Sequence, residues 1–546
     1  MVSASPKGAQ RGGAERSPGE SPKGAPAAAL DVAILGGGLA GNLLARQLKR
    51  RLPELRVGLF ERETGTSYKV GEATVEIAAS YLVRRQGLSS YLYEQQLPKN
   101  GLRYFFDDAE KSLPLPEMSE IGTVNLPFHP AFQLDRARLE ADLLDMNRRD
   151  GVRVRSAARV GEVELGSGGA PHRFAVREAG GVTRFSARWL VDAAGRGGLL
   201  ARRLGLRLPE PEHQLGSVWG RFEGVADIDE LGPESFRARV RHTARRLSTL
   251  HFWYPGYWIW MIPLRGGVTS VGVTGRRMAA EPELRTPAGF RAFLDEHRAV
   301  RELLAGSKVL DHGSYRRIAY GTRRFFHPDR WGLTGESATS ADPLYSPGGD
   351  FIALENDLLA DLIARDAAGE GANALAERCE LYDAFMRFRH EAAMLLYIGL
   401  YEGQGSFELA RAKWDFDIGC YYNLWVSPYL LDQHLDPAFL RRQLRLRPFI
   451  LQALKNFAGL FQRVEAELRR RGDYFRRNRG EFHYGLANID FAERVGLPRS
   501  PREVLEATGV VFHRVRAGAL ELLGRGPAAD QAPLPLSAYL LDRPLD

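Results

Sequence analysis

The sequence DVAILGGGLAGNLLARQLKRRLPELRVGLFE occupies residues 31–61 and predicts a strand, a tight turn, a helix and a second strand, in that order. Residues 31–35 are a short apolar run rich in strand formers, which is typical of a buried parallel strand. Residues 42–51 have the composition of a helix, and residues 56–60 that of the second strand. This order indicates an α/β fold built on a parallel sheet.

The turn after the first strand has the spacing G-x-G-x-x-G at Gly36, Gly38 and Gly41. The first glycine permits the turn, the second lets the backbone approach a pyrophosphate, and the third lets the helix pack on the strand. Glu61 follows 20 residues after Gly41, where an acid holds ribose hydroxyls. The spacing alone fits a turn without a ligand, but the ordered elements predict a dinucleotide site. This site comprises Gly36, Gly38, Leu39, Ala40, Gly41 and Glu61.

Length and charge restrict the class of protein. The 546 residues allow two or three domains, or one large domain with insertions, and 44% hydrophobic content fits a globular chain. The net charge of +8 is spread along the chain, so we do not expect nucleic-acid binding. No apolar run approaches the ~18 residues that a membrane span needs, so we expect none.

Cysteine usage and the N-terminus indicate a cytoplasmic protein. Cys379 and Cys420 are far apart and match no metal spacing, so we expect a reducing compartment and no metal site. Residues 1–30 are rich in Gly, Ser, Pro and Ala and lack an apolar signal core. They are predicted to be a disordered tail.

Two further strands end in small-residue turns, at 189–197 with Gly195 and at 331–338 with Gly335 and Glu336. Three such strands suit FAD, which lies across strand C-termini, better than a simple NAD fold. Residues 204–324 alternate apolar and polar residues as an antiparallel sheet would. Within them, Trp258 and Trp260 are two apart and therefore share a face. Helices are expected at 358–367, 374–401, 437–471 and 501–523.

This pattern predicts an FAD-binding module over 31–365, with the sheet inserted at 204–324, followed by a helical region over 366–546. Two features stay open. Residues 69–75 form a glycine-centred turn that is either a helix entry with Thr74 as N-cap or a second backbone loop against a cofactor. The local sequence around Lys99, which lies between a proline and a glycine, predicts a surface lysine.

Several separated motifs together resemble the flavin-dependent halogenases, relatives of the FAD-dependent aromatic monooxygenases built on the glutathione-reductase-type fold. The resemblance covers residues 31–363. The motifs are the glycine turn, the loop Gly71-Glu72-Ala73-Thr74, Lys99 in K-x-G, Trp258-x-Trp260-x-Ile262-Pro263, Gly335-Glu336, and Asp342-Pro343-Leu344-Tyr345-Ser346-Pro347-Gly348.

The resemblance implies a mechanism. Reduced FAD, supplied by a separate flavin reductase, reacts with oxygen to a C4a-hydroperoxide, which chloride or bromide converts to hypohalous acid. A tunnel leads this oxidant to a separate aromatic substrate. Lys99 would direct it, either by hydrogen bonding or as a haloamine, with Ser346 near the tunnel. The tunnel wall would comprise Trp258, Trp260, Ile262 and Pro263.

The same resemblance extends the cofactor and halide sites. Backbone amides of Gly348 and Gly349 would bind the halide. The FAD contacts beyond the first turn would be Glu72, Ala73, Thr74, Arg136, Gly195, Gly335, Glu336, Pro343, Gly348 and Gly349.

Two departures from the family pattern bear on the substrate and the halide. Tyr345 stands where tryptophan-type enzymes carry a glutamate before the serine, so Tyr345 is assigned to the substrate side. It favours a phenolic or pyrrolic substrate, free or tethered to an acyl or peptidyl carrier protein. Pro347 has no amide N–H, so one expected halide donor is missing.

Two other functions remain open. An FAD-dependent monooxygenase or dehydrogenase that does not use halide would share the scaffold, and a halide requirement distinguishes it. A flavin-binding interaction protein without activity would consume no oxygen from reduced FAD.

Overall fold

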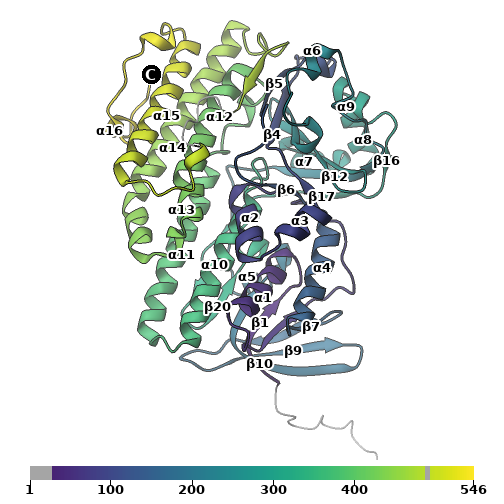
Figure 1. Cartoon of the computed structure of the whole chain (residues 1–546), viewed down its shortest axis with the longest axis vertical. Helices are drawn as coiled ribbons and strands as arrows, with labels where there is room; N and C mark the ends of the chain where they lie inside the picture. The colour runs from purple at the N-terminus through teal and green to yellow at the C-terminus, as the bar shows by residue number, and fades with distance from the viewer. Residues whose placement is uncertain (1–27, 486–491) are drawn as a thin grey trace, which may run out of the picture.

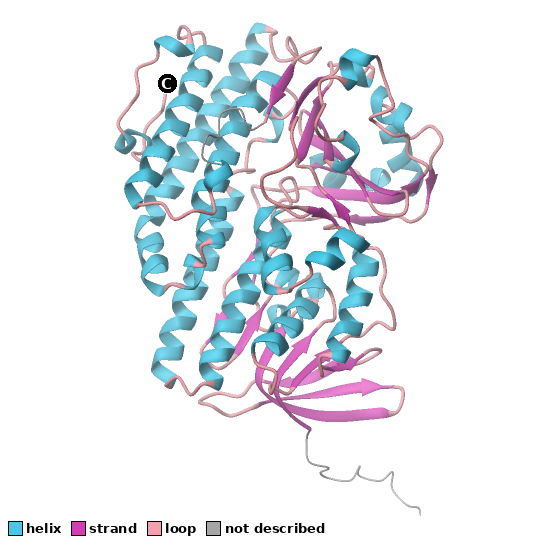
Figure 2. Ribbon diagram, in the orientation of Figure 1, coloured by secondary structure: helices cyan, strands magenta, loops and turns pink. Residues whose placement is uncertain are grey.

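The computed structural model describes residues 28–485 and 492–546. Figures 1 and 2 show a lower α/β part, a second sheet beside its upper end, and a column of long helices along both. Strand β1 (Ala28–Leu35) already includes residues 28–30, so the predicted tail is three residues too long. Residues 1–27 lie outside the described chain.

The lower sheet carries the predicted strand–turn–helix unit. From β20 to β7, neighbouring strands pair in parallel around the central β1. Residues 181–192 form one long strand that starts before the strand predicted from residue 189, and its first half also pairs with an antiparallel hairpin. The strands in spatial order are β19 (Phe326–His327), β20 (Trp331–Leu333), β10 (Gly181–Asp192), β1, β2 (Val57–Phe60) and β7 (Arg153–Arg155), with β9 (His172–Glu178) and β8 (Arg159–Glu164) extending β10.

Helix α1 (Leu39–Arg51) follows the glycine turn and lies between α4 (Arg136–Arg149) and α10 (Pro347–Ala367). Its buried Leu44 and Leu48 are one turn apart and face the sheet core. Helix α4 begins after Asp135, whose side chain caps it by accepting a hydrogen bond from the Arg138 amide at 3.1 Å.

The second sheet is larger and more mixed than predicted. Most of its pairs are antiparallel, but β4 pairs with β13 in parallel, as does β21 with β5. Three of its strands lie outside 204–324, because the sheet recruits residues that are distant in sequence. The strands are β16 (Lys308–Val309), β12 (Gly216–Glu223), β15 (Val268–Gly275), β14 (Tyr257–Pro263), β13 (Thr249–Tyr254), β4 (Leu102–Phe106), β5 (Ser119–Gly122) and β21 (Phe482–Tyr484), with β17 (Gly313–Tyr315) on β12.

The two faces of β14 pack against different cores, as the period of two requires. Ile259 and Met261 join the cluster under α8 (Pro287–Asp295) and α9 (Arg298–Leu303). Trp258 and Trp260 join the opposite cluster, which includes residues of the C-terminal helices. The prediction that both tryptophans share a face is confirmed, and this face is directed toward the C-terminal region.

The C-terminal region consists mainly of α11 (Ala372–Met394), α12 (Phe407–Tyr421), α14 (Pro437–Arg471) and α15 (Pro501–Leu522). The sequence did not predict α12, and it placed the start of α10 at residue 358, eleven residues too late. The start was missed because Pro347-Gly348-Gly349 has loop composition, although proline is favourable at the first helical position. Among the described residues, no helix is both long and apolar enough to cross a bilayer.

Candidate active site

The glycine turn has the geometry that the sequence predicts. Gly36 has φ +119°, and a Cβ there would lie 2.3 Å from the Ala193 carbonyl oxygen. A Cβ on Gly41 would lie 2.0 Å from the Gly36 oxygen, whereas a Cβ on Gly38 would meet no atom within 4 Å. Two glycines are therefore required by packing, and the third faces open space that a pyrophosphate can fill.

Glu61 lies at the C-terminal end of β2 beside this turn. Its carboxylate accepts hydrogen bonds from the Gly37 amide at 2.7 Å and the Glu63 amide at 2.9 Å. The amides at the start of α1 point into the same turn, because the first turn of a helix leaves them without intrahelical acceptors. These residues fit the adenosine diphosphate half of FAD.

The turns after β10 and β20 meet next to α1. Ser337 donates to Asp192 at 3.0 Å and thereby joins the two turns. Gly335 has φ +63°, and a Cβ there would lie 2.9 Å from the Cβ of Ala40. The Glu336 carboxylate pairs with Arg196 at 2.8 Å, next to Gly195. The structure thus brings together the cofactor turns that the sequence placed on three separate strands.

The 71–74 loop is held against strand β6 (Phe132–Gln133) rather than forming a helix cap. Thr74 donates to the Phe132 carbonyl at 2.9 Å and accepts from the Phe132 amide at 2.7 Å. The N-cap of α2 (Glu76–Ser80) is Val75, so the reading of Thr74 as N-cap is wrong. Ala73 forms a bridge with Gln133. The turn is therefore a fixed backbone loop.

Charged side chains around this loop are engaged by other protein groups. Glu72 is buried, pairs with Arg221 at 2.8 Å and accepts from Ser270 at 3.2 Å. Burial raises the pKa of Glu72 to about 6, although Arg221 opposes the shift. Arg136 donates to the Val70 carbonyl at 2.9 Å and pairs with Glu140, so it supports the loop from outside.

Lys99 is fully buried rather than a surface lysine. Its ammonium donates to the Thr74 carbonyl at 2.7 Å, which joins it to the 71–74 loop. Burial lowers the pKa of Lys99 to about 8, while the nearby carboxylates of Glu76 and Asp350 raise it. Burial lowers the pKa of His251, and the charge of Lys99 lowers it further. Lys99 is thus close to the first turn of α10, which contains Asp350.

Ser346 is the N-cap of α10 and has φ +56°, a strained conformation for a residue with a side chain. Pro347 is the first helical residue, where an amide would lack an intrahelical acceptor in any case. The amides of Gly348 and Gly349 follow in the first turn, and a Cβ on Gly348 would meet no atom within 4 Å. Together with the exposed Pro343, this turn forms an open rim at the helix N-terminus.

The two motif tryptophans are hydrogen-bonded to different loops. Trp258 donates to the Tyr401 hydroxyl at 3.0 Å, and Tyr401 donates to Asp342. Trp260 donates to Ser270 at 3.3 Å, which donates in turn to Glu72. Ile262 and Pro263 complete the same strand. The strand therefore connects both predicted cofactor loops.

Tyr345, the predicted substrate-side residue, lies beside α12. Its hydroxyl donates to Asp417 at 2.6 Å, and the Lys413 ammonium lies 5.5 Å from its ring centroid. Sequence reasoning missed Lys413 and Asp417, since α12 itself was not predicted. It also assigned no role to Asp342 or Tyr401, and only the Asp-Pro pair at 342–343 could have indicated the former.

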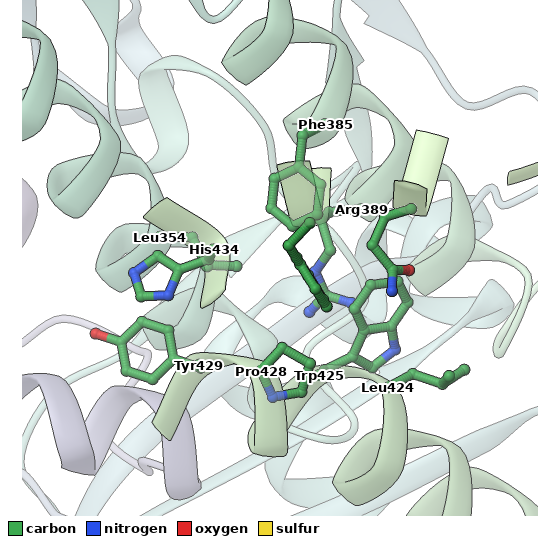
Figure 3. A pocket seen from close by; sticks show the side chains of 10 residues that line it. Leu354, Phe385, Arg389, Leu424, Trp425, Pro428, Tyr429 and His434 are labelled. Atoms are coloured by element: carbon green, nitrogen blue, oxygen red, sulfur yellow. The ribbon is translucent and has the colours of Figure 1, made fainter. Parts of the chain in front are cut away.

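Figure 3 shows a small pocket between α10 and the C-terminal helices, and neither Lys99 nor Ser346 is among the residues that line it. The buried Arg389 guanidinium lies over the Trp425 ring, 3.3 Å from its centroid. Burial lowers the pKa of Arg389 to about 9. A second small pocket is lined by Trp253 and Lys413, and the Lys413 ammonium lies over the Tyr345 ring.

Comparisons with known proteins agree with this geometry. A family model described as FAD binding domain matches residues 29–289. Flavin-dependent halogenase chlA of Dictyostelium discoideum is 28% identical over 444 residues, covering 75% of this chain and 72% of that protein. A 1H-pyrrole-2-carbonyl-(peptidyl-carrier protein) chlorinase of Pseudomonas fluorescens is 26% identical over 345 residues, covering 58% of this chain and 72% of that protein.

The structure of halogenase PltM in complex with phloroglucinol and FAD matches with a TM-score of 0.62 at 19% identity, over 93% of this chain and 94% of that one. This likeness shows the shared fold, a mixed α/β FAD-binding architecture with a helical C-terminal region. The glycine turn, the buried Lys99 and the tryptophan strand place the motifs of one family on that fold. The chain belongs to the flavin-dependent halogenase family and is a flavoprotein oxidoreductase.

Proposed function

We propose that the protein chlorinates or brominates an electron-rich aromatic ring, using FADH2, oxygen and halide. Bound FADH2, formed by a separate flavin reductase, would supply two electrons to oxygen, and halide would supply the other two and thereby be oxidised to hypohalous acid. The observation that carries this proposal is the buried Lys99 amine, which is joined to the 71–74 loop and lies near the N-terminus of α10.

Lys99 receives and directs the oxidant. Because burial lowers its pKa to about 8, a fraction of the amine is neutral near pH 7 and can act as a nucleophile toward hypohalous acid. The hydrogen bond to Thr74 fixes its ammonium against the cofactor loop. This hydrogen bond therefore joins the reactive amine directly to the backbone of the proposed cofactor loop.

The halide binds at the amides of Gly348 and Gly349. The N-terminus of an α-helix attracts anions through its free amides and its dipole. Pro347 removes only the first amide, and its ring fixes the φ angle with which the helix begins. The missing donor is thus compensated by the helical geometry of the next two residues.

Trp258 and Trp260 keep the aromatic substrate away from the flavin, and residues 366–546 cover the substrate side. Both rings belong to a cluster that includes Tyr397, Tyr401 and Trp414 of the C-terminal region. A wall of this kind lets a small oxidant pass and excludes a ring, which prevents direct hydroxylation.

Phenols and pyrroles are the proposed substrates, free or tethered to a carrier protein. Their hydroxyl or N–H activates the ring, so they need no glutamate at the position of Tyr345. The Pseudomonas fluorescens chlorinase is named for a pyrrole on a peptidyl carrier protein, which supports the tethered form.

A test of this function requires no knowledge of the natural substrate. Protein carrying anaerobically reduced FAD is mixed with oxygen, with and without bromide or chloride, and hypohalous acid is trapped with a small halogen acceptor. We expect trapped halogen in proportion to the flavin oxidised, and none with free reduced FAD. Oxygen consumption that yields no trapped halogen at saturating halide would overturn the proposal and favour the monooxygenase. Direct reduction of the bound FAD by NAD(P)H would contradict the proposal that a separate flavin reductase supplies the reduced cofactor.

A further inference from the structure

Asp417 of α12 is a buried carboxylate with one oxygen held and one oxygen unused. Its Oδ2 accepts a hydrogen bond from Tyr345 at 2.6 Å and pairs with the Lys413 ammonium. Its Oδ1 is buried and has no hydrogen-bond partner among the residues that the structure describes. An unmet acceptor on a buried carboxylate is costly unless a ligand or water satisfies it.

A second unmet polar group belongs to a ring that packs on the same indole as Tyr345, the hydrogen-bond partner of Asp417. The Tyr104 hydroxyl of β4 is fully buried and also lacks a partner within the described chain. The rings of Tyr104 and Tyr345 pack on the same indole, with centroids 4.9 and 6.1 Å from that of Trp414. Burial raises the pKa of Tyr104, Tyr345 and Tyr397, and the charge of Asp417 adds to the shift of each hydroxyl.

This cluster adjoins an opening and lies on the Lys99 side of the second sheet. Lys413 and Trp253 line the second pocket, and the ring centroids of Trp253 and Tyr104 are 4.4 Å apart. On its other side Tyr104 stacks on His251 at 4.7 Å, and burial together with the charge of Lys99 lowers the pKa of that imidazole. An aromatic ring bound here would lie between the second pocket and the reactive amine.

We propose that Asp417 is the base for a phenolic substrate, whose hydroxyl lies between the unpartnered Asp417 Oδ1 and the Tyr104 hydroxyl. This inference rests on the proposed function and specifies its substrate as a phenol. Tyr345 and Lys413 are positioning residues that hold Oδ2. Tyr345 occupies the place where tryptophan-type enzymes carry their glutamate, so here the carboxylate comes instead from α12, next to that place.

The proposed step is balanced in atoms and electrons. The phenolic proton passes to Asp417 Oδ1 while a ring carbon attacks the halogen of hypohalous acid. The carbon–halogen bond forms, the halogen–oxygen bond breaks, and the departing hydroxide takes the proton from Asp417 to become water. The ring is oxidised by two electrons and the halogen is reduced. The halogenated ring carbon then loses its proton and the hydroxyl re-forms, which gives the halophenol.

The first experiment compares Asp417→Asn with wild type on phenol and on 4-nitrophenol, which is largely ionised at mildly alkaline pH. General-base catalysis is worth about 10²-fold or more, so product from phenol should fall by about that factor. At a pH above the titration of bound 4-nitrophenol, product from this substrate should change little, since its proton is already lost. Trapped hypohalous acid without substrate should stay at the wild-type level, which separates this inference from the proposed function. Asp417→Glu should restore part of the phenol activity.

A matched control is Asp361→Asn. Asp361 is a similarly buried carboxylate that accepts from the Tyr382 hydroxyl at 2.8 Å and pairs with Arg365 at i+4. It loses the same kinds of bond outside the proposed site, so we expect unchanged selectivity between the two phenols. Wild-type turnover of phenol by Asp417→Asn, with hypohalous acid still formed, would overturn the inference alone.

The second experiment does not depend on halogenation. The absorbance of bound 4-nitrophenol reports whether it is neutral or ionised. In wild type, a hydrogen bond from the hydroxyl of 4-nitrophenol to Asp417 favours the neutral form of the ligand. In Asp417→Asn the ammonium of Lys413 has no counter-charge, so the ligand should ionise at lower pH. The double variant Lys413→Met with Asp417→Asn removes both charges and serves in case the single variant does not fold. In this double variant the titration of bound 4-nitrophenol should no longer be shifted to lower pH. Identical titrations of bound ligand in wild type and Asp417→Asn would overturn the proposal.

Discussion

The indole N–H of Trp258 donates to the Tyr401 hydroxyl at 3.0 Å, which joins the tryptophan strand to the C-terminal region. The same hydroxyl donates to Asp342 Oδ2 at 2.5 Å, and the His213 ring nitrogen lies 2.7 Å from that oxygen. Asp342 Oδ1 accepts from the Leu344 amide at 2.9 Å. One buried chain of hydrogen bonds therefore connects the sheet, the helices and the loop that carries Ser346.

We expect Trp258→Phe and Tyr401→Phe to be non-additive. Each variant removes one end of the same bond, so the double variant should be more stable than the sum of the single effects predicts, by about 1 kcal/mol. Denaturant unfolding of the four proteins measures this coupling. Trp258→Phe combined with Tyr382→Phe serves as the control and should be additive. Additivity in the first cycle would mean that this bond contributes nothing to stability.

Alanine at two glycines of the first turn should separate folding from cofactor binding. In Gly41→Ala the new Cβ would clash with the Gly36 backbone, so the apo protein should melt at lower temperature or fail to fold. In Gly38→Ala the Cβ faces open space, so apo stability should persist while FAD affinity falls by about tenfold or more as the methyl group displaces the pyrophosphate. Thermal melts and FAD titrations check this, with Gly180→Ala as an open-turn control. Unchanged FAD affinity in Gly38→Ala would contradict the placement of the pyrophosphate.

Lys99→Met should still form hypohalous acid but lose product by about 10²-fold. Lys99→Arg should be equally impaired, because a guanidinium stays protonated and is not a nucleophile. In wild type, product per hypohalous acid should rise as pH increases through about 8, since the neutral amine accumulates above the pKa. Product analysis under single-turnover conditions measures both effects, and the exposed Lys455→Met is the control. An active arginine variant would show that Lys99 acts by hydrogen bonding alone.

Arg221→Met should destabilise the apo protein in a pH-dependent way. Glu72 has a native pKa of about 6, above its ordinary 4.5. The free energy of unfolding therefore falls as pH rises from 4.5 to about 6, and the loss persists at higher pH. Removal of Arg221 leaves the carboxylate unpaired and raises its pKa further. We expect a loss of about 3–5 kcal/mol at pH 8 and a smaller loss at pH 5, where Glu72 binds a proton.

Denaturant unfolding of wild type and variant at both pH values tests this expectation. Arg502→Met, which breaks an exposed pair with Glu506, should have almost no effect at either pH. An equal loss for Arg221→Met at pH 5 and pH 8 would show that Glu72 is not the group responsible.

The strand, turn and helix around Gly36–Gly41 could be predicted because their causes are local. A steric need for glycine, a run of strand formers and a helical period are properties of neighbouring residues, and they do not depend on the rest of the fold. The alternation that placed Trp258 and Trp260 on one face is local for the same reason. Helix α10 shows where this reasoning fails, because Pro347-Gly348-Gly349 is equally compatible with a loop until the helix packs against the sheet.

The sequence by itself therefore determined the cofactor turn, the tryptophan strand and the family to which they belong. Only the tertiary structure decided that Lys99 is buried, that β4 and β21 join the second sheet, and which groups contact Tyr345. Tyr345 and Asp417 are 72 residues apart, and Trp258 and Tyr401 are 143 apart, so no local pattern relates them. Such pairs form because burial removes water from polar groups, which then must find partners wherever the packed chain brings them.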